Sequence, residues 1–317
     1  MATAFSPSNS VTTTTADKFI PDIWSDEIVA AYKKNLVLAN LVMKMNFKGK
    51  KGDTIHIPAP TRGSASAKAA EAAVTLIAAT ESEVNVSINK HYEYSRLIED
   101  IVEAQALNSL RNFYTSDAGY ALAKQVDTDL VQLGRSTNGG AGTNAYATGA
   151  FIGGDGTTAY VAANNNESAL TDAAIRRTIQ RLDDTDTPMD QRFFLIPPSS
   201  RNTLMGLARY TEQAFVGGTN STIRTGEIGN LYGIPVFVSS NCDTASGSNN
   251  ARVCLMGHRD AVVLVEQVAV RSQVQYKQEY LATLFTSDTL YGVQILRSAA
   301  SVSAAKSASM FALIVPA

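Results

Sequence analysis

The chain has 317 residues, enough to bury a substantial core in one large or two medium domains. Hydrophobic residues make up 45% of it and charged residues 18%, which disfavours a disordered chain, and no apolar run approaches the roughly 20 residues of a membrane span. The net charge of -2 provides no general basic field. This weighs against a sequence-specific nucleic-acid binder, but not against a protein that merely encloses DNA.

The first 18 or so residues are rich in Ser, Thr and Ala and predict a flexible arm. Residues 1–15 lack a basic residue followed by an apolar stretch, so no secretory signal is predicted and intracellular synthesis is expected. A short amphipathic helix is expected next, with Ser25 as its N-cap and Lys33 and Lys34 at its end. Trp24, just before this helix, is interpreted as a core anchor or as a contact to another subunit.

Residues 48–91 predict an extended two-stranded hairpin. Residues 54–58 and 84–88 alternate in the manner of strands, and the segment between them, residues 59–83, has few large apolar groups. We expect this segment to form an arm with a mobile tip. Because an isolated two-stranded ribbon is marginal in water, such an arm needs a neighbouring surface.

Charge is divided unevenly along this hairpin. Residues 48–68 carry five positive charges and one negative charge, whereas residues 69–83 carry only three negative charges. The charged residues are Lys48, Lys50, Lys51, Asp53, Arg62 and Lys68 in the first part, and Glu71, Glu81 and Glu83 in the second. Either this is a solvated hairpin with scattered charge, or the charges are complementary to other copies of the chain and steer their register.

The strongest periodicity predicts a long helix over residues 98–133. Apolar residues recur there at steps of one, three or four, which over 36 positions gives a helix of about 54 Å at 1.5 Å per residue. Gly119 is a candidate position for a kink or a break. A helix this long exceeds the needs of a compact domain and is typical of a structural spine.

The second half alternates shorter elements. We expect a loop or weak hairpin over residues 138–166, a helix over 168–182 ended by the acidic segment 183–188, and a buried strand over 192–196. Ser199 or Ser200 is expected to cap a short helix around Leu204, and a glycine-rich loop follows over 209–233. Further strands are predicted over residues 234–238, 253–256, 261–265, 268–274, 290–297 and 310–315. Helices early and strands late indicate the α+β class.

Signatures of chemistry are weak in this sequence. No phosphate-binding, dinucleotide-binding or nucleophile-elbow motif occurs, and His56, His91 and His258 lack the partners of a zinc motif. The run of Asp183, Asp184, Asp186 and Asp190 is the best metal candidate, but without a calcium-loop glycine and glutamate it is interpreted as a solvated linker. The two cysteines, Cys242 and Cys254, are expected to be reduced. We therefore predict no enzyme, no catalytic residue, no cofactor and no metal.

Short segments in a fixed order resemble a known family. They are residues 20–25, 51–58, 91–94, 98–100, 114–123, 188–197, 226–236 and 290–293. In this order the chain resembles the major capsid proteins of tailed double-stranded-DNA phages, whose fold is shared with herpesvirus capsid floors, and within them the short-tailed podovirus subgroup. The resemblance implies an N-terminal arm with a short helix over 1–47, an extended hairpin (E-loop) over 48–91, a peripheral domain with the spine helix over 92–198, an axial domain over 199–280 and a return to the peripheral domain over 281–317.

The resemblance also implies a function. We expect an icosahedral shell subunit that self-assembles into hexamers and pentamers in the host cytoplasm and encloses genomic DNA without sequence-specific binding. The expected partners are a separate scaffolding protein and a portal, a decoration protein is left open, and no membrane is expected. A nanocompartment (encapsulin-like) shell subunit, a tail-tube protein and an enzyme with an unrecognised site are the alternatives. The residues expected at contacts between subunits are Trp24, Lys48, Lys51, Arg62, Lys68, Glu71, Glu81, Glu99, Asp100 and Arg111.

Overall fold

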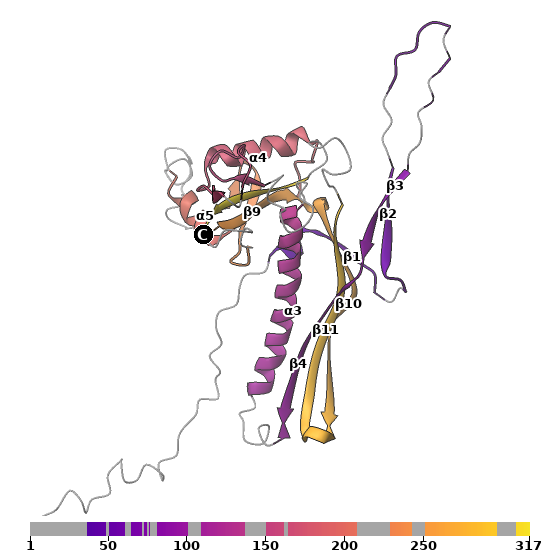
Figure 1. The fold of residues 1–317 in the computed structure, drawn as a ribbon, viewed down its shortest axis with the longest axis vertical. Coiled ribbons are helices and arrows are strands. Elements are labelled where there is room, and N and C mark those ends of the chain that lie inside the picture. The colour runs from indigo at the N-terminus through magenta and orange to yellow at the C-terminus, as the bar shows by residue number, and fades with distance from the viewer. Residues whose placement is uncertain are drawn as a thin grey trace, which may run out of the picture.

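The fold was analysed in a computed structural model (Figure 1). The structure describes residues 37–48, 51–60, 65–71, 73–74, 76, 81–100, 109–136, 150–161, 164–207, 229–242, 251–296 and 309–317. The predicted helix at residues 25–34 and nearly all of the predicted loop at 209–233 lie outside these ranges.

The first of two large sheets has four strands in the order β1-β10-β11-β4. The strands are β1 (Met43–Asn46), β10 (Val262–Lys277), β11 (Ala282–Ile295) and β4 (Lys90–Glu99), and only the β1–β10 pair is parallel. The long helix α3 (Ser109–Ser136) runs beside β4 and β11 (Figure 1). The first sheet and α3 together form an elongated body.

The second sheet has six strands in the order β5-β12-β9-β6-β8-β7. These are β5 (Ala150–Ile152), β12 (Met310–Pro316), β9 (Ala251–His258), β6 (Arg192–Ile196), β8 (Ile234–Val238) and β7 (Asn230–Leu231). Its central strands are buried on both faces, which explains their continuous apolar sequences. One face packs on α4 (Asp172–Asp184) and α5 (Pro198–Met205), and the other packs on the C-terminal half of α3 and on α1 (Leu38–Leu41).

A two-stranded ribbon projects from the body (Figure 1). It consists of β2 (Thr54–Pro60) and β3 (Glu81–Ser87), which pair antiparallel from Thr54 opposite Ser87 to Pro60 opposite Glu81. The predicted strands 54–58 and 84–88 are confirmed. The predicted extended hairpin therefore has a paired base, and the described residues 65–71 continue it away from the body.

The start of the long helix was predicted wrongly. Ile98 belongs to β4, where it lies opposite Thr283, and α3 begins at Ser109 and has 28 residues, or about 42 Å. Residues 92, 94 and 98 are also spaced as the apolar positions of a strand. All ten residues of β4 pair with β11, and this pairing selects the strand over the helix that the spacing from residue 98 onward predicted. Gly119 does not split the helix, because α3 is continuous through it.

Other boundaries also differ from prediction. Helix α4 begins at Asp172 with Thr171 as its N-cap, four residues later than expected. Helix α5 begins at Pro198, and neither serine caps it, because the N-cap is Pro197 and no side chain bonds there. The two strands predicted over 261–274 form one strand, β10, with bulges that break the apolar alternation, and β11 begins at Ala282 rather than near 290.

Strand pairing cuts across the predicted domain ranges. The second sheet combines β5 and β6 from the range 92–198, β7 to β9 from 199–280 and β12 from 281–317. Strand β10 also falls in the range 199–280, but it belongs to the first sheet. The division into axial and peripheral domains stays a prediction, because those names refer to positions in an assembled shell.

Candidate inter-subunit surfaces and the joint behind them

The C-terminal half of α3 carries two buried aspartates, Asp127 and Asp129, which are 1% and 5% exposed. Asp127 accepts hydrogen bonds from the backbone N–H groups of Leu38 at 2.9 Å and Ala39 at 3.3 Å, and from the side-chain amide of Asn241 at 3.0 Å. Leu38 begins α1, and Asn241 lies just beyond β8 in the second sheet. One carboxylate thus connects the spine helix to the N-terminal segment and to the second sheet.

Asp129 connects the same helix to the first sheet. Its Oδ2 atom accepts a hydrogen bond from the Tyr291 hydroxyl at 2.7 Å and lies 3.0 Å from the Lys90 ammonium, while Oδ1 accepts from Gln125 at 3.0 Å. Burial, followed by the bond to Asp129, raises the pKa of the Tyr291 hydroxyl far above its ordinary value, so it stays protonated and donates. Lys90 is the first residue of β4, directly after the ribbon, so this ion pair fixes the base of the ribbon.

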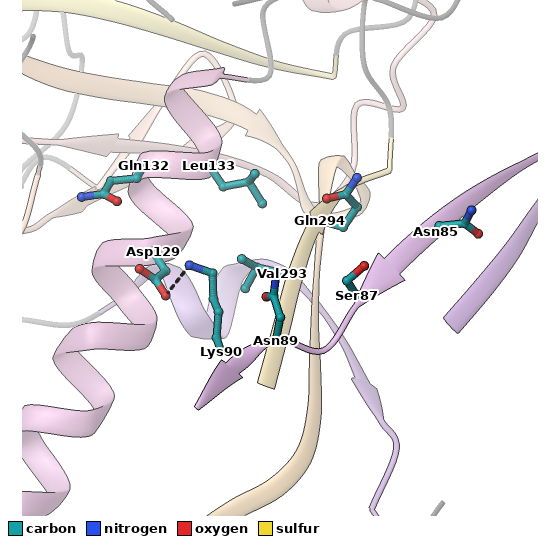
Figure 2. A pocket seen from close by; sticks show the side chains of 9 residues that line it. All are labelled: Asn85, Ser87, Asn89, Lys90, Asp129, Gln132, Leu133, Val293 and Gln294. Atoms are coloured by element: carbon teal, nitrogen blue, oxygen red, sulfur yellow. Dashed lines mark ion pairs between the residues drawn. The ribbon is translucent and has the colours of Figure 1, made fainter. Parts of the chain in front are cut away.

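A polar recess of about 440 Å³ opens beside this ion pair (Figure 2). Figure 2 shows Lys90 reaching from β4 to Asp129 on α3, with Asn85 and Ser87 approaching from β3. The nine lining residues are Asn85, Ser87, Asn89, Lys90, Asp129, Gln132, Leu133, Val293 and Gln294. Amide and hydroxyl groups dominate, so the recess suits water or a hydrogen-bonding side chain.

We call Asp127, Asp129 and their partners Leu38, Asn241, Lys90 and Tyr291 the joint.

The base of the ribbon packs on the first sheet, on the face away from α3. Val86 and Ile88 are 0% and 7% exposed and form a small apolar cluster with Val263 and Val265 of β10. At Gly292 of β11 the two backbones approach so closely that a Cβ atom would lie 2.5 Å from the Ser87 carbonyl oxygen. Only glycine permits this crossing without a shift of backbone.

Outside its middle strand, where Ala282 and Asp288 are buried, the remainder of that face is largely exposed in the described chain. On β4, Tyr94 donates to Asp117 of α3 at 3.1 Å, and the Arg96 guanidinium lies 4.7 Å from the ring of Tyr114, so even-numbered residues face the helix. Because side chains alternate along a strand, the odd-numbered residues point the other way. We call this the open face; it comprises Glu93, Ser95, Leu97 and Glu99 of β4, the opposite residues Asp288, Thr286, Leu284 and Ala282 of β11, and Arg271, Gln273, Gln275 and Lys277 of β10.

An ion network lies at the end of the open face that is nearer to the base of the ribbon. The Arg271 guanidinium donates to both carboxylate oxygens of Asp288, at 2.8 and 2.9 Å, and His91 lies 3.2 Å from the same carboxylate. The bonds from Arg271 hold the pKa of Asp288 below its ordinary value, against the opposing effect of burial, and His91 adds to the lowering. The network ties all three long strands together across the sheet.

Large apolar side chains are exposed at two ends of the molecule. At the tip of the ribbon, Val74 and Leu76 are 68% and 88% exposed. At the far end of the β10–β11 hairpin, Tyr280 and Leu281 are 63% and 66% exposed, and Leu97 on the open face is 46% exposed. Apolar groups gathered at projecting ends are typical of surfaces that another molecule covers.

The predicted contact residues are scattered over the described chain, and their role at contacts stays a prediction. Lys48 lies 4.0 Å from Glu266, and Asp100 accepts a hydrogen bond from the Tyr276 hydroxyl at 2.8 Å. Four others are exposed in the single chain: Lys51, Lys68, Glu71 and Glu99. Trp24 and Arg62 lie outside the described residues, and Glu81 and Arg111 lie in β3 and α3 with side chains that are not described.

The joint was missed by sequence reasoning. Asp127 and Asp129 lie within one turn before the buried Leu130 of α3, and carboxylates so close to a buried apolar stripe were the available signal. Their partners are separated from them by up to 162 positions in the chain, so spacing could not identify them.

Metal and membrane sites were also sought in the described part of the chain. There, no group of three or more His, Cys, Asp or Glu residues is arranged to hold a metal ion. Asp183 of the acidic run instead pairs with Arg192 at 2.8 Å. Among the described helices, none is long and apolar enough to span a bilayer.

Comparison with known proteins agrees with this architecture. The family model for the phage capsid family matches residues 17–304. The chain belongs to the phage capsid family. This capsid protein is thus a structural component of a virion, and three expectations are confirmed: a phage capsid protein, a mixed α+β fold and the role of a capsid shell subunit. The matches give no support to the nanocompartment or tail-tube alternatives.

Solved structures show the same fold. A chain of Mycobacterium phage Che8 superposes with a TM-score of 0.72 at 20% identity, covering 93% of this chain and 97% of that one. The capsid of cyanophage P-SCSP1u gives 0.72 at 19% identity over 99% of both chains, and the capsid asymmetric unit of cyanophage Pam1 gives 0.70 at 12% identity over 100% and 99%. No curated protein sequence gives a significant match.

Proposed function

We propose that copies of this capsid protein form hexamers and pentamers that close into an icosahedral shell around double-stranded DNA. The observation that carries this proposal is the ribbon: it projects from the body with Val74 and Leu76 exposed at its tip. A ribbon of this kind is marginal alone and is stabilised when it lies on a neighbouring subunit. Many modest contacts, repeated by symmetry, then stabilise the shell.

We assign the parts of this subunit to places in the shell. The second sheet with α4 and α5 forms the axial domain at the local symmetry axes, and the first sheet with α3 forms the peripheral domain. This assignment moves Val262–Lys277 from the predicted axial range to the peripheral domain, because that strand pairs within the first sheet. Trp24 and the charged residues predicted at contacts serve the surfaces between subunits.

The wall encloses DNA without reading its sequence, since a chain of net charge -2 offers little attraction to phosphate. We assign no enzymatic activity to the chain. Assembly takes place in the host cytoplasm with a separate scaffolding protein and a portal, and a decoration protein is left open.

The test shortens the ribbon while keeping its base. In the described register Pro60 lies opposite Glu81, so residues 61–80 are replaced by an Asn-Gly turn that closes the hairpin in two residues. We expect a folded subunit by circular dichroism and no closed shells by negative-stain microscopy. Ala67→Ser, on the exposed ribbon, is the matched control and should form shells. Closed shells from the shortened variant would refute the role of the ribbon.

A further inference from the structure

Two arginines on one flank of α4 lack acceptors for their hydrogen bonds. Arg177 and Arg181 are one helical turn apart, and both are half-buried. In the part of the chain that the structure describes, Nε of Arg177 and Nη1 of Arg181 are shielded from solvent and have no hydrogen-bond partner. Arg177 donates through Nη1 to Gln180 at 2.7 Å. The guanidinium of Arg181 lies over the ring of Phe151, 3.3 Å from its centroid.

Neither arginine forms an ion pair with a carboxylate in the described residues. Asp155 is the acid that acts on Arg181, but its oxygens are occupied by the backbone N–H groups of Thr157 and Thr158, at 2.8 and 2.9 Å, and by the Thr158 hydroxyl at 2.6 Å. Burial, followed by the charge of Arg177, lowers the pKa of Arg181 to about 10, and Asp155 opposes this only in part. Two like charges in a half-buried site are unfavourable until an anion joins them, and guanidinium groups bind carboxylates well.

Carboxylates without a partner lie at the C-terminal end of the same helix and just beyond it. Asp184, Asp186 and Asp190 are exposed, and none of them pairs with a cation in the described chain. Asp183, in contrast, pairs with Arg192 of its own chain at 2.8 Å. The unit built on the second sheet therefore carries an unsatisfied basic site and an unsatisfied acidic segment.

The acidic segment is held in a fixed conformation. The buried side chain of Arg192 donates to the carbonyl oxygens of Thr187 at 2.6 Å and Pro188 at 2.8 Å. Asp186 and Gln191 both have a φ of 53°, a left-handed conformation that costs energy for non-glycine residues and persists where the surroundings impose it. A segment already fixed in this way loses little conformational entropy when it binds, so it is preorganised for a contact.

The two halves do not meet within one copy, because no ion pair joins them in the described chain. A self-assembling chain presents both halves to its neighbours, so each copy can offer its acidic segment to one neighbour and receive that of another. Such a contact is heterologous and repeats from copy to copy. Met189, which is 78% exposed within the acidic segment, adds an apolar group for the neighbour to cover.

We propose that the Arg177–Arg181 pair of one copy binds the acidic segment 183–190 of the next copy. This inference rests on the proposed function and adds to it a contact in which the ribbon takes no part. The phosphates of DNA are the rival anion. Two half-buried guanidinium groups form no extended basic surface, however, and the net charge of -2 adds no general attraction to DNA.

Exchanging the charges tests this contact in the full chain. Asp184→Arg with Asp190→Arg alters exposed side chains without a partner in the described residues, so the subunit should fold normally. Its yield of closed shells, measured on sucrose gradients and by negative-stain microscopy, should fall by about tenfold or more, because like charges would then meet at every contact. Arg177→Glu with Arg181→Glu should give the same loss. A chain with all four substitutions should recover most of the shells, since each contact is restored with its signs exchanged.

Arg176→Glu is the matched control. Arg176 is exposed on the same helix and pairs with Asp172 of its own chain at 2.9 Å, so this variant should still form shells. Thermal unfolding of the unassembled subunit separates a lost contact from a lost fold: the midpoint of the Asp184→Arg, Asp190→Arg variant should stay within about 1 °C.

Three results would overturn the contact. They are normal shells from the variant with both aspartates replaced, normal shells from the variant with both arginines replaced, and no recovery in a folded chain with all four substitutions. If the arginine variant formed normal shells that held less DNA, the site would bind phosphate instead. If the unaltered chain formed no closed shells, the proposed function itself would fail, which is a separate result.

Discussion

The joint predicts the largest single-residue effect on the stability of this subunit. Asp127→Ala removes a carboxylate that is 1% exposed and accepts well-formed bonds from the Leu38 amide and the Asn241 side chain. Hydrogen bonds to charged groups contribute about 1.5–3 kcal/mol each, and both donors would stay buried without an acceptor. We expect the free energy of unfolding to fall by about 3–5 kcal/mol.

Thermal unfolding of the unassembled subunit, followed by circular dichroism, measures this loss. With an unfolding entropy of about 2.1 cal/mol/K per residue, the midpoint should fall by about 5–7 °C. Asp117→Ala is the matched control on the same helix: Asp117 is half-buried and accepts the Tyr94 hydroxyl at 3.1 Å, so its loss should shift the midpoint by about 1 °C. Equal shifts for the two variants would refute the assignment of Asp127 to the joint.

Two further predictions concern the ribbon base and the ion network. Gly292→Ala should displace the ribbon, because the new Cβ meets backbone, and should reduce closed shells in electron micrographs; Gly119→Ala, with nothing within 4 Å, should assemble normally. Asp288→Asn should make the free energy of unfolding depend less on pH below about pH 4. Because Arg271 lowers the folded-state pKa of Asp288, this carboxylate stabilises the fold above its unfolded pKa of about 3.9 and loses that contribution as pH falls below it. Thermal unfolding between about pH 2 and pH 6 checks this, and parallel profiles for the two proteins would contradict it.

Local patterns sufficed for much of the fold. The ribbon strands were predictable because alternation and a long Ala, Ser and Thr segment admit few other structures. Strand β6 and strand β12 were predictable as short buried apolar runs. The charge division along residues 48–83 was also visible in the sequence.

The errors share one physical cause, which is that partners distant in sequence decide between local alternatives. Residues 92–98 fit a helix or a strand about equally, and pairing with β11 selects the strand. The bulges in β10 interrupt the alternation of apolar residues, so a single long strand has the sequence pattern of two short strands. Likewise, an aspartate in a helix is ordinary until Lys90, Tyr291 or Asn241 is known to lie beside it.

The joint and the ribbon act together on the geometry of assembly. In the proposed shell the ribbon of one copy contacts a neighbouring copy, and a contact of this kind is heterologous: it closes into rings or extends into filaments according to the rotation between copies. That rotation depends on the direction in which the ribbon leaves its own body. Direction is set within a few residues, by the close crossing at Gly292 and by the Lys90–Asp129 ion pair immediately after the ribbon. A small displacement there would be carried along the ribbon to its tip, so we expect substitutions at the base, such as Gly292→Ala, to change closed shells into open assemblies without altering the contact surface.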